Sequence, residues 1–220
     1  MKSIAVVAQV EDSKNLLRQI NKQTIVPDDV IIYTDTSPAK GINERRQRIA
    51  DNHAILQEMV WQHAPDLVWQ LEQDVDLPDD ALERLLENYN KLKGRDFGYV
   101  SGVQVGRHGL YCLGAWHIGE NEFSSLDYKL TGIQEVDATG FYCLLAEGVT
   151  WLNGKAWWEG EAWGPDVNWG ISIPKKKYVD MDLQIGHIVK NGIIRPSNIS
   201  TTNVTFKRSD NGSWNYKTTD

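Results

Sequence analysis

Apolar and polar positions follow a regular order through the first half of the chain. Continuous apolar runs with β-branched residues, such as SIAVVAQV at 3–10, indicate strands that are buried on both faces. Segments whose apolar residues recur three and four positions apart, such as 41–64, indicate helices with one buried face. The pattern predicts strands at 3–10, 28–37, 66–74 and 97–105, with helices at 13–23, 41–64 and 77–92 between them.

This alternation predicts an α/β fold of the Rossmann-like kind, with a mostly parallel central sheet flanked by helices, because crossovers between consecutive strands are right-handed. Ligands of such sheets bind beyond the carboxyl ends of the strands, which here are residues 8–11, 34–37 and 73–76. The chain has no GxGxxG turn after the first strand and no GxxxxGK motif. Neither a dinucleotide-binding turn nor a P-loop is therefore expected.

The second half of the chain has a different composition. Six of the nine tryptophans lie between Trp116 and Trp169, in segments that are also rich in glycine. Such rings either pack in the interior or present flat apolar faces on which sugars or bases stack, and the sequence leaves both interpretations open. Residues 204–217 indicate a hairpin that turns around residues 210–212.

Length and composition fit one globular domain with a small C-terminal appendage. The 220 residues include 41% hydrophobic and 24% charged side chains, and the formal net charge is −7. An acidic chain repels phosphate, so a general nucleic-acid or membrane-surface binder is not expected. The first apolar run is too short for a membrane span or a signal peptide, and Cys112 and Cys143 are the only cysteines. We therefore expect a cytoplasmic protein with no integral membrane segment and with reduced thiols.

Five carboxylates, from Glu72 to Asp80, gather at the end of the stretch DLVWQLEQDVDLPDD, which contains the third predicted strand. Asp79 and Asp80 are explained by the start of the next helix, because a helix N-terminus favours anions. Asp74 and Asp76 are not explained in this way. Like charges repel one another, so this pair favours a bound cation. Glu72 receives no assignment from the sequence.

Three features together carry a resemblance to a known family. They are Asp-Val-Asp at 74–76 after three strand and helix units, the acidic glycine-rich EGEAWGPDVNWG at 159–170, and an isolated Gly-His at 186–187. In this order, residues 3–187 resemble the GT-A fold of nucleotide-sugar glycosyltransferases, in particular the family 2 type. The resemblance implies a glycosyltransferase domain at 1–189, with a nucleotide-binding half at 1–105, an acceptor-side half at 106–189, and a C-terminal tail or hairpin at 190–220.

The resemblance implies a divalent cation, Mn²⁺ or Mg²⁺, that offsets the negative charge developing on a departing diphosphate. Asp76 would be a direct ligand. Asp74 would assist it and also contact the nucleotide sugar, and His187 would be the third protein ligand. The alternative for His187 is a packed or solvated histidine at the end of a strand.

The resemblance also implies where the nucleotide sugar would bind. Ala8 and Gln9 in the first strand and Asp35 after the second would contact the nucleoside. Arg45 and Arg48 in the following helix are the candidates for the diphosphate. The alternative for each arginine is an ordinary solvated helix residue.

For an inverting transfer, a general base must take the proton of the acceptor hydroxyl. Asp166 is the candidate, with Glu161 and Glu159 behind it, because this chain has Gly-Pro-Asp where many family members have an acidic Glu-Asp segment. A retaining enzyme would need no such base. The donor would be a nucleoside diphosphate sugar, and the acceptor a glycan, a small molecule, a protein or a modified nucleic-acid base. The C-terminal tail is a candidate contact for a homo-oligomer.

Two other functions fit the same pattern. A nucleotidyltransferase also uses paired carboxylates and a metal on an α/β sheet, but it normally carries a glycine-rich basic loop after the first strand, which AQVEDSKN lacks. The other is a non-catalytic carbohydrate-binding relative that has lost turnover. The joint presence of Asp74, Asp76, Asp166 and His187 argues against it.

Overall fold

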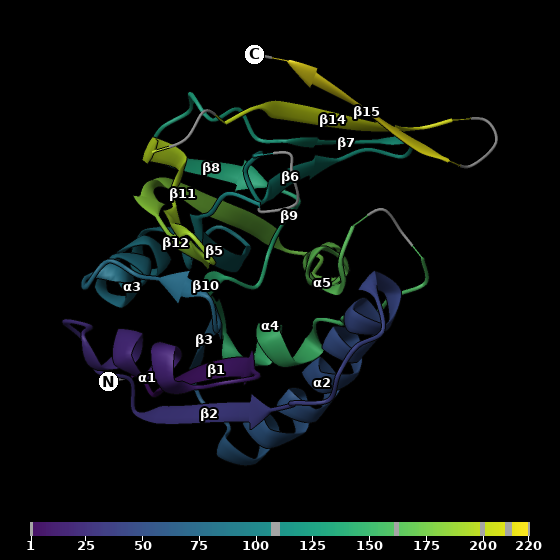
Figure 1. Ribbon diagram of the computed structural model, residues 1–220. Helices are drawn as coiled ribbons and strands as arrows, with labels where there is room; N and C mark the ends of the chain where they lie inside the picture. Colours follow the sequence, from purple (N-terminus) through teal and green to yellow (C-terminus); the bar gives the residue numbers. More distant parts are fainter. Residues whose placement is uncertain (1, 107–110, 161–162, 199–200, 210–212, 220) are drawn as a thin grey trace.

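The computed structural model describes residues 2–106, 111–160, 163–198, 201–209 and 213–219. A seven-stranded sheet lies at its centre, with helices on both faces (Figure 1). In spatial order the strands of this sheet are β2 (Asp29–Thr34), β1 (Ile4–Val10), β3 (Leu67–Glu72), β10 (Cys143–Glu147), β5 (Phe97–Val103), β11 (Lys176–Gln184) and β8 (Ile133–Val136).

Five of the seven strands run in the same direction. β1 pairs in parallel with β2 and β3, and β5 pairs in parallel with β11. β10, which lies between β3 and β5, and the edge strand β8 are antiparallel to their neighbours. The predicted α/β fold with a mostly parallel central sheet flanked by helices is confirmed.

Helices cover both faces of the sheet because successive side chains of a strand point to opposite sides. On one face, Leu85 of α3 packs in the same apolar cluster as Val6 of β1. On the other face, Leu56 of α2 and Trp169 of α5 pack in the cluster that contains Val7. Burial on both faces explains the continuous apolar runs of the sequence. The helices are α1 (Lys14–Asn21), α2 (Ile42–His63), α3 (Ala81–Leu92), α4 (Gly148–Asn153) and α5 (Pro165–Ser172).

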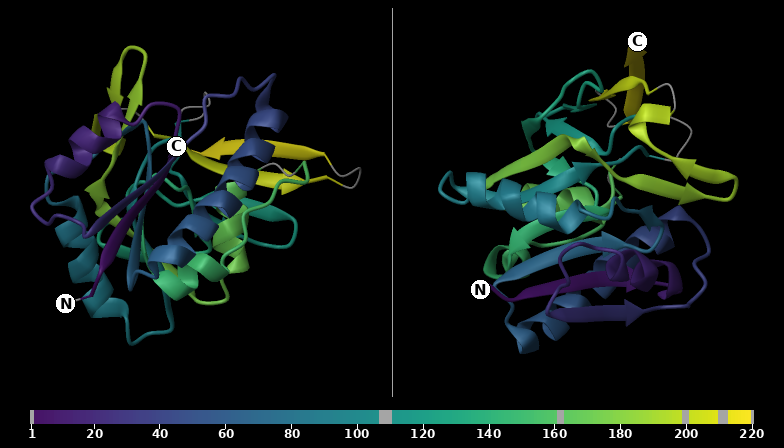
Figure 2. Two further views of the ribbon diagram at one scale, coloured as in Figure 1. Left: turned by 90° about the horizontal axis from the view of Figure 1, so that it is seen from below. Right: turned by 90° about the vertical axis from the view of Figure 1, so that its left-hand side faces the viewer.

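The third strand ends earlier than the sequence predicts. β3 stops at Glu72, a turn follows at Gln73 and Asp74, and the next two residues form the short strand β4 (Val75–Asp76). β4 pairs with β12 (Gly186–Val189) in a three-stranded sheet that is completed by β13 (Gly192–Ile194). The β12–β13 hairpin projects from the central sheet (Figure 2). The pattern of apolar and polar residues does not predict the pairing of β4 with β12, because β12 lies far along the sequence.

The glycine- and aromatic-rich second half contributes to a five-stranded sheet. β14 and β15 form the antiparallel pair predicted at 204–217, whose turn at 210–212 lies outside the described residues. β14 also pairs with β7, so the C-terminal strands extend a sheet that begins in residues 115–139. Its strands in spatial order are β15 (Trp214–Thr219), β14 (Asn203–Arg208), β7 (Glu122–Ser125), β6 (Ala115–Ile118) and β9 (Ala138–Thr139), and the 3₁₀ turn η1 (Pro196–Asn198) precedes β14.

Among the residues that the structure describes, no helix combines the length and the apolar character that crossing a membrane requires.

A glycine at the start of α4 allows this helix to lie close to the chain that leads into β3. A Cβ at position 148 would collide with the carbonyl oxygen of Pro65, which belongs to the backbone and cannot rotate away. Gly148→Ala is therefore expected to lower the free energy of unfolding by about 1–3 kcal/mol, the usual cost of overpacking. Gly94→Ala is the matched control, because nothing lies within 4 Å of a Cβ there. Guanidinium denaturation of both variants measures the difference, and equal midpoints would contradict the close approach.

Candidate functional site

A cleft of about 570 Å³ opens at the carboxyl ends of β1 and β3, where ligands of such sheets bind. Its walls come from α2, from the residues that follow β5, from the start of α5 and from Phe206 of β14. A second hollow of about 580 Å³ lies at residues 36–39, directly after β2. The residues that line both hollows are Glu11, Arg45, Arg48, Gln73 and Asp74.

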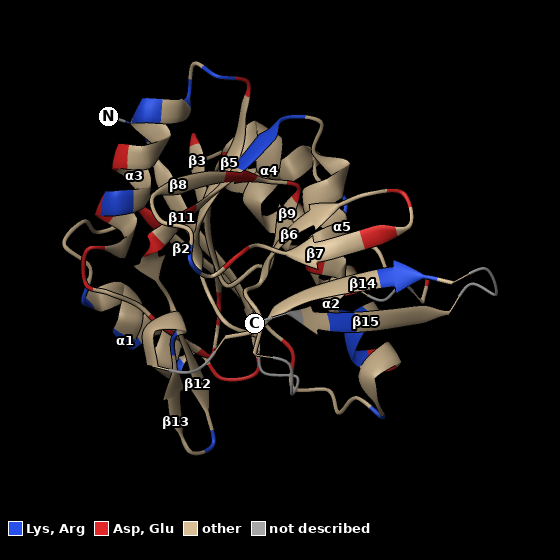
Figure 3. Cartoon of the chain, turned by 90° about the horizontal axis from the view of Figure 1, so that it is seen from above, with Lys and Arg blue, Asp and Glu red and all other residues tan. Residues whose placement is uncertain are grey.

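The two ends of the cleft differ in charge. The end formed by residues 106–167 and by Phe206 is mostly aromatic, apolar or glycine, and Asp166 is the one carboxylate among its described residues. Over the rest of the molecule, acidic and basic residues are interspersed rather than gathered on one face (Figure 3). Because of this difference within the cleft, the end that holds the charged side chains suits a charged ligand group, and the aromatic end suits an uncharged one. The charged residues of the first end are Glu11, Asp35, Arg45, Arg46, Arg48, Glu72 and Asp74.

Asp35 lies at the rim of the cleft with its carboxylate held in place. The amide of Asn52 donates a hydrogen bond to it at 2.8 Å and the backbone N–H of Ser37 donates another at 2.9 Å. Arg48 Nε lies 3.5 Å from the same carboxylate. The hydrogen bond from Asn52 is the largest cause that lowers the pKa of Asp35 to about 2, so this group is ionised at neutral pH.

The other residues predicted for the nucleotide sugar divide into two groups. Gln9, Arg45 and Arg48 line the cleft. Ala8 does not, because it is completely buried inside β1, where it pairs with Leu71 of β3 and with β2 on the other side. The strand continues past Ala8 to Val10, so the first residues that reach the cleft are those from Gln9 onward.

Asp74 and His187 meet at one side of the cleft. His187 is buried, and its Nδ1 lies 3.0 Å from the carbonyl oxygen of Val105. A carbonyl only accepts hydrogen bonds, so Nδ1 carries the proton and Nε2 faces the Asp74 carboxylate at 3.3 Å. A backbone carbonyl that fixes a histidine tautomer in this way is a common arrangement behind metal-ligating imidazoles.

Asp76 is placed differently from the sequence prediction. It does not line the cleft, and its carboxylate forms an ion pair with Arg195 and accepts a hydrogen bond from Gln19 Nε2 at 3.4 Å. Of the predicted ligands, Asp74 and His187 are thus brought together, and Asp76 is not. Across the part of the chain that the structure describes, no three His, Cys, Asp or Glu side chains form a group that could hold a metal ion.

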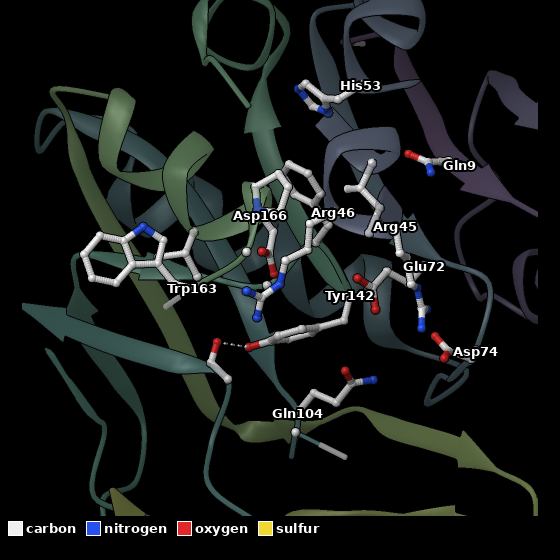
Figure 4. Close-up of a pocket in the computed structure, with 18 of the residues that line it drawn as sticks. Gln9, Arg45, Arg46, His53, Glu72, Asp74, Gln104, Tyr142, Trp163 and Asp166 are labelled. Atoms are coloured by element: carbon white, nitrogen blue, oxygen red, sulfur yellow. Dashed lines mark hydrogen bonds between the residues drawn. The ribbon is translucent and has the colours of Figure 1, made fainter. Parts of the chain in front are cut away.

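Glu72 is a cleft residue that sequence reasoning leaves unassigned. It lies at the end of β3 and points into the cleft beside Asp74 (Figure 4). The alternation of side chains along β3 is the sequence feature that could have identified Glu72. Gln70 and Glu72 are two positions apart on the same side of the strand, and both line the cleft. Gln104 and Tyr142 also line the cleft, and the sequence did not identify them as site residues. The Tyr142 hydroxyl donates to the carbonyl of Gly114 at 3.2 Å.

Asp166 lies at the start of α5 and points into the centre of the cleft, close to Arg46 (Figure 4). Its carboxylate fits between two glycines. A Cβ at Gly164 would collide with one carboxylate oxygen, and a Cβ at Gly140 would lie 3.2 Å from the other. Burial raises the pKa of Asp166, while the backbone N–H groups at the start of the helix and the charge of Arg46 act in the opposite direction. Of the two residues predicted behind it, Glu159 is exposed, and Glu161 lies outside the described residues.

Three buried polar atoms of the cleft have no hydrogen-bond partner among the described residues. They are Oε1 of Gln70, Nε2 of His53 and Nη1 of Arg48. His53 stacks on Phe141 with ring centroids 4.9 Å apart, and burial lowers its pKa to about 3, so it is neutral. Unsatisfied buried polar atoms are rare in folded proteins, and beside a cleft a ligand or a water molecule can supply the missing partner.

The sequence left open whether the tryptophans of the second half pack in the interior or present their rings to a ligand, and the structure has examples of interior rings and of rings that line the cleft. Trp151 and Trp169 are completely buried and pack in the interior. Trp116 and Trp163 are only partly buried and line the cleft. Trp158 packs against the Arg46 guanidinium, whose central carbon lies 4.5 Å from the ring centroid.

No protein-family model matches this chain, and no curated protein sequence matches it. Solved structures do share its fold. A crystal structure of A197 from STIV superposes with a TM-score of 0.62 at 13% sequence identity, over 90% of this chain and 92% of that one.

A crystal structure of GalNAc-T7 with UDP, GalNAc and Mn²⁺ superposes with a TM-score of 0.53 at 11% identity. The match covers 86% of this chain and 44% of that chain, so this chain spans less than half of GalNAc-T7. At such low identity, both similarities show the fold alone.

Asn52 is expected to control the acidity of Asp35. In Asn52→Ala the pKa of Asp35 should rise from about 2 toward its ordinary value of 3.8, because the strongest hydrogen bond to the carboxylate is lost. The stability that Asp35 contributes is present above its ordinary pKa and is lost as the pH falls toward 2, so the variant should lose less stability in that window. A carboxyl NMR titration measures the pKa. Asn90→Ala, an exposed change on α3, is the control, and an unchanged pKa in Asn52→Ala would show that Asn52 is not the cause.

Proposed function

We propose that this protein is a glycosyltransferase that moves a sugar from a nucleoside diphosphate sugar to an acceptor hydroxyl with the help of a divalent cation. One observation carries the proposal. A single cleft has arginines, carboxylates and a histidine at one end and a partly buried carboxylate, Asp166, on the wall toward the other end. The fold-level similarity to GalNAc-T7, whose crystal structure contains UDP, GalNAc and Mn²⁺, supports the same conclusion.

The charged end of the cleft is suited to the nucleotide. Arg45 and Arg48 line both hollows and supply positive charge for a diphosphate. One guanidinium nitrogen of Arg48 is buried and has no hydrogen-bond partner among the described residues, which fits a ligand oxygen there. Asp35 and Gln9 would contact the nucleoside, with the ionised Asp35 as a hydrogen-bond acceptor.

Asp74 and His187 fit a divalent cation, Mn²⁺ or Mg²⁺, because a carboxylate oxygen and Nε2 of the imidazole face each other, and a bound cation would take the place of a proton on Nε2. Glu72 lines the same part of the cleft. A cation held there would offset the negative charge of the departing diphosphate. Asp76 pairs with Arg195 outside the cleft and is given no part in holding the cation.

Asp166 is suited to be the general base of an inverting transfer. The acceptor oxygen forms a bond to the anomeric carbon while the bond from that carbon to the diphosphate oxygen breaks, and its electron pair leaves with the diphosphate. The hydroxyl proton passes to the Asp166 carboxylate. Burial raises the pKa of this group, which makes it a better proton acceptor than an exposed aspartate.

Asp74 and Asp76 are expected to differ in their effect on nucleotide binding. In isothermal titrations of UDP and GDP with and without Mn²⁺, at least one nucleotide should bind in a metal-dependent manner. Asp74→Asn should weaken that binding about 10-fold or more, as is typical for residues around a metal site. Asp76→Asn is the matched control and should leave the affinity nearly unchanged, because its carboxylate pairs with Arg195 outside the cleft. If Asp76→Asn weakens nucleotide binding and Asp74→Asn does not, Asp76 is the metal ligand. Nucleotide binding that does not depend on Mn²⁺ would contradict the proposed cation site.

Asp166→Asn is expected to lower the rate of sugar transfer by about 10²–10⁴-fold, the usual contribution of a general base. Because the substitution keeps the shape of the side chain, the affinity for the donor nucleotide should not change. Asp79→Asn, an exposed change outside the cleft, is the control. The donor is found first by screening nucleotide sugars for metal-dependent hydrolysis. Transfer that continues at the full rate in Asp166→Asn would exclude this residue as the base.

A further inference from the structure

Four of the aromatic rings that line the uncharged end of the cleft together form its aromatic wall. They come from parts of the chain that are distant in sequence: Trp116 from β6, Phe123 from β7, Trp163 from the segment before α5, and Phe206 from β14. Trp163 lies across the cleft from Asp74, with Asp166 between them (Figure 4).

Contacts among the rings hold the aromatic wall in a fixed arrangement. Phe206 stacks on Phe123 with centroids 4.4 Å apart and planes within 3°. Trp163 meets Phe123 edge to face at 5.0 Å, and its indole N–H donates to Asn168 Oδ1 at 2.5 Å. Asn168 is on α5, the helix that carries Asp166. The orientation of the Trp163 ring is thus fixed relative to the proposed base.

Interior packing does not account for this arrangement. Rings that only fill the core are completely buried here, as Trp69 and Trp151 are. Trp116, Trp163 and Phe206 keep part of their surface exposed and present it to the cleft. Partly exposed, rigid aromatic rings around a cavity are typical of surfaces that bind the flat apolar face of a ligand.

The charge of this end limits the class of ligand. The described residues at 106–167 and 206 that line it include no lysine or arginine, and Arg46 of α2, which also lines the cleft, lies beside the Asp166 carboxylate (Figure 4). Lys207, the basic residue next to Phe206, is paired with Glu122 at 2.6 Å. Phosphorylated acceptors and nucleic acids need cations along their path, and the net charge of −7 opposes them further.

We infer that the aromatic wall is the acceptor subsite and that the acceptor is a neutral carbohydrate. One apolar face of its sugar ring would rest on Trp163 and Phe206, and one hydroxyl would reach the Asp166 carboxylate. The inference rests on the proposed glycosyltransferase function and adds the class of the acceptor.

The test compares acceptors and wall variants. Once a donor is found, transfer is measured to neutral trisaccharides of glucose, galactose, mannose and N-acetylglucosamine, to peptides that contain serine and threonine, and to single-stranded oligonucleotides. At least one trisaccharide should accept the sugar. Phe206→Leu removes the ring and should lower kcat/KM for that acceptor about 10-fold or more, whereas Phe206→Tyr keeps the ring and should restore most of it.

Two controls separate a local effect from a loss of folding. Trp61→Ala removes a ring on α2 that is 73% exposed and does not line the cleft, and it should leave transfer unchanged. The metal-dependent Kd for the nucleotide should be the same in Phe206→Leu as in the original protein. Transfer only to peptides or oligonucleotides, or an equal kcat/KM in Phe206→Leu, would overturn the acceptor assignment and leave the proposed function standing.

A different result would identify a failure of the proposed function itself. If no nucleotide sugar is turned over, direct titration of the four trisaccharides into the protein decides the inference. Saccharide binding that is lost in Phe206→Leu and kept in Phe206→Tyr would support a carbohydrate site without transfer. No binding at millimolar concentration would overturn both.

Discussion

The turn at Gln73 and Asp74 is the constraint on which the arrangement of the site depends. Separate parts of the chain hold its backbone: the Asn15 amide donates to the carbonyl of Gln73 at 2.9 Å, and the N–H of Ile188 donates to the carbonyl of Asp74 at 2.7 Å. In an uninterrupted strand, Asp74 and Asp76 would share one face. Because the turn ends β3 and lets β4 pair with β12, Asp74 lines the cleft while Asp76 pairs with Arg195.

The position of Asp166 depends on packing at the junction of the two sheets. Its helix, α5, packs against β9 at Gly170, where a Cβ would lie 3.0 Å from the side chain of Ala138. β9 belongs to the five-stranded sheet, while Trp169 of the same helix packs on the central sheet. The helix that carries the proposed base therefore joins the sheet that bounds the charged end of the cleft to the sheet that carries most of the aromatic wall.

Much of the first half could be predicted from the sequence, because strands that are buried on both faces leave unbroken apolar runs. The same logic placed Gln9 and Asp35 at strand ends. It could not separate Glu72 and Asp74 from Asp76, since that depends on a two-residue strand whose partner lies far along the chain. Nor could it find the insertion of β10 between β3 and β5, or the pairing of β14 with β7. These long-range contacts leave no local period in the sequence.

A carboxylate acts as a general base only if it is ionised when the acceptor arrives and still binds a proton readily. For Asp166, opposing effects act on the pKa. Burial raises its pKa, and the charge of Arg46 and the backbone N–H groups of α5 limit the rise. Trp158 holds Arg46 by a cation–π contact, so the guanidinium stays near the carboxylate instead of extending into water. Without that positive charge, burial would raise the pKa of Asp166 with less opposition. The aromatic residues of the second half thus contribute to the chemistry as well as to packing.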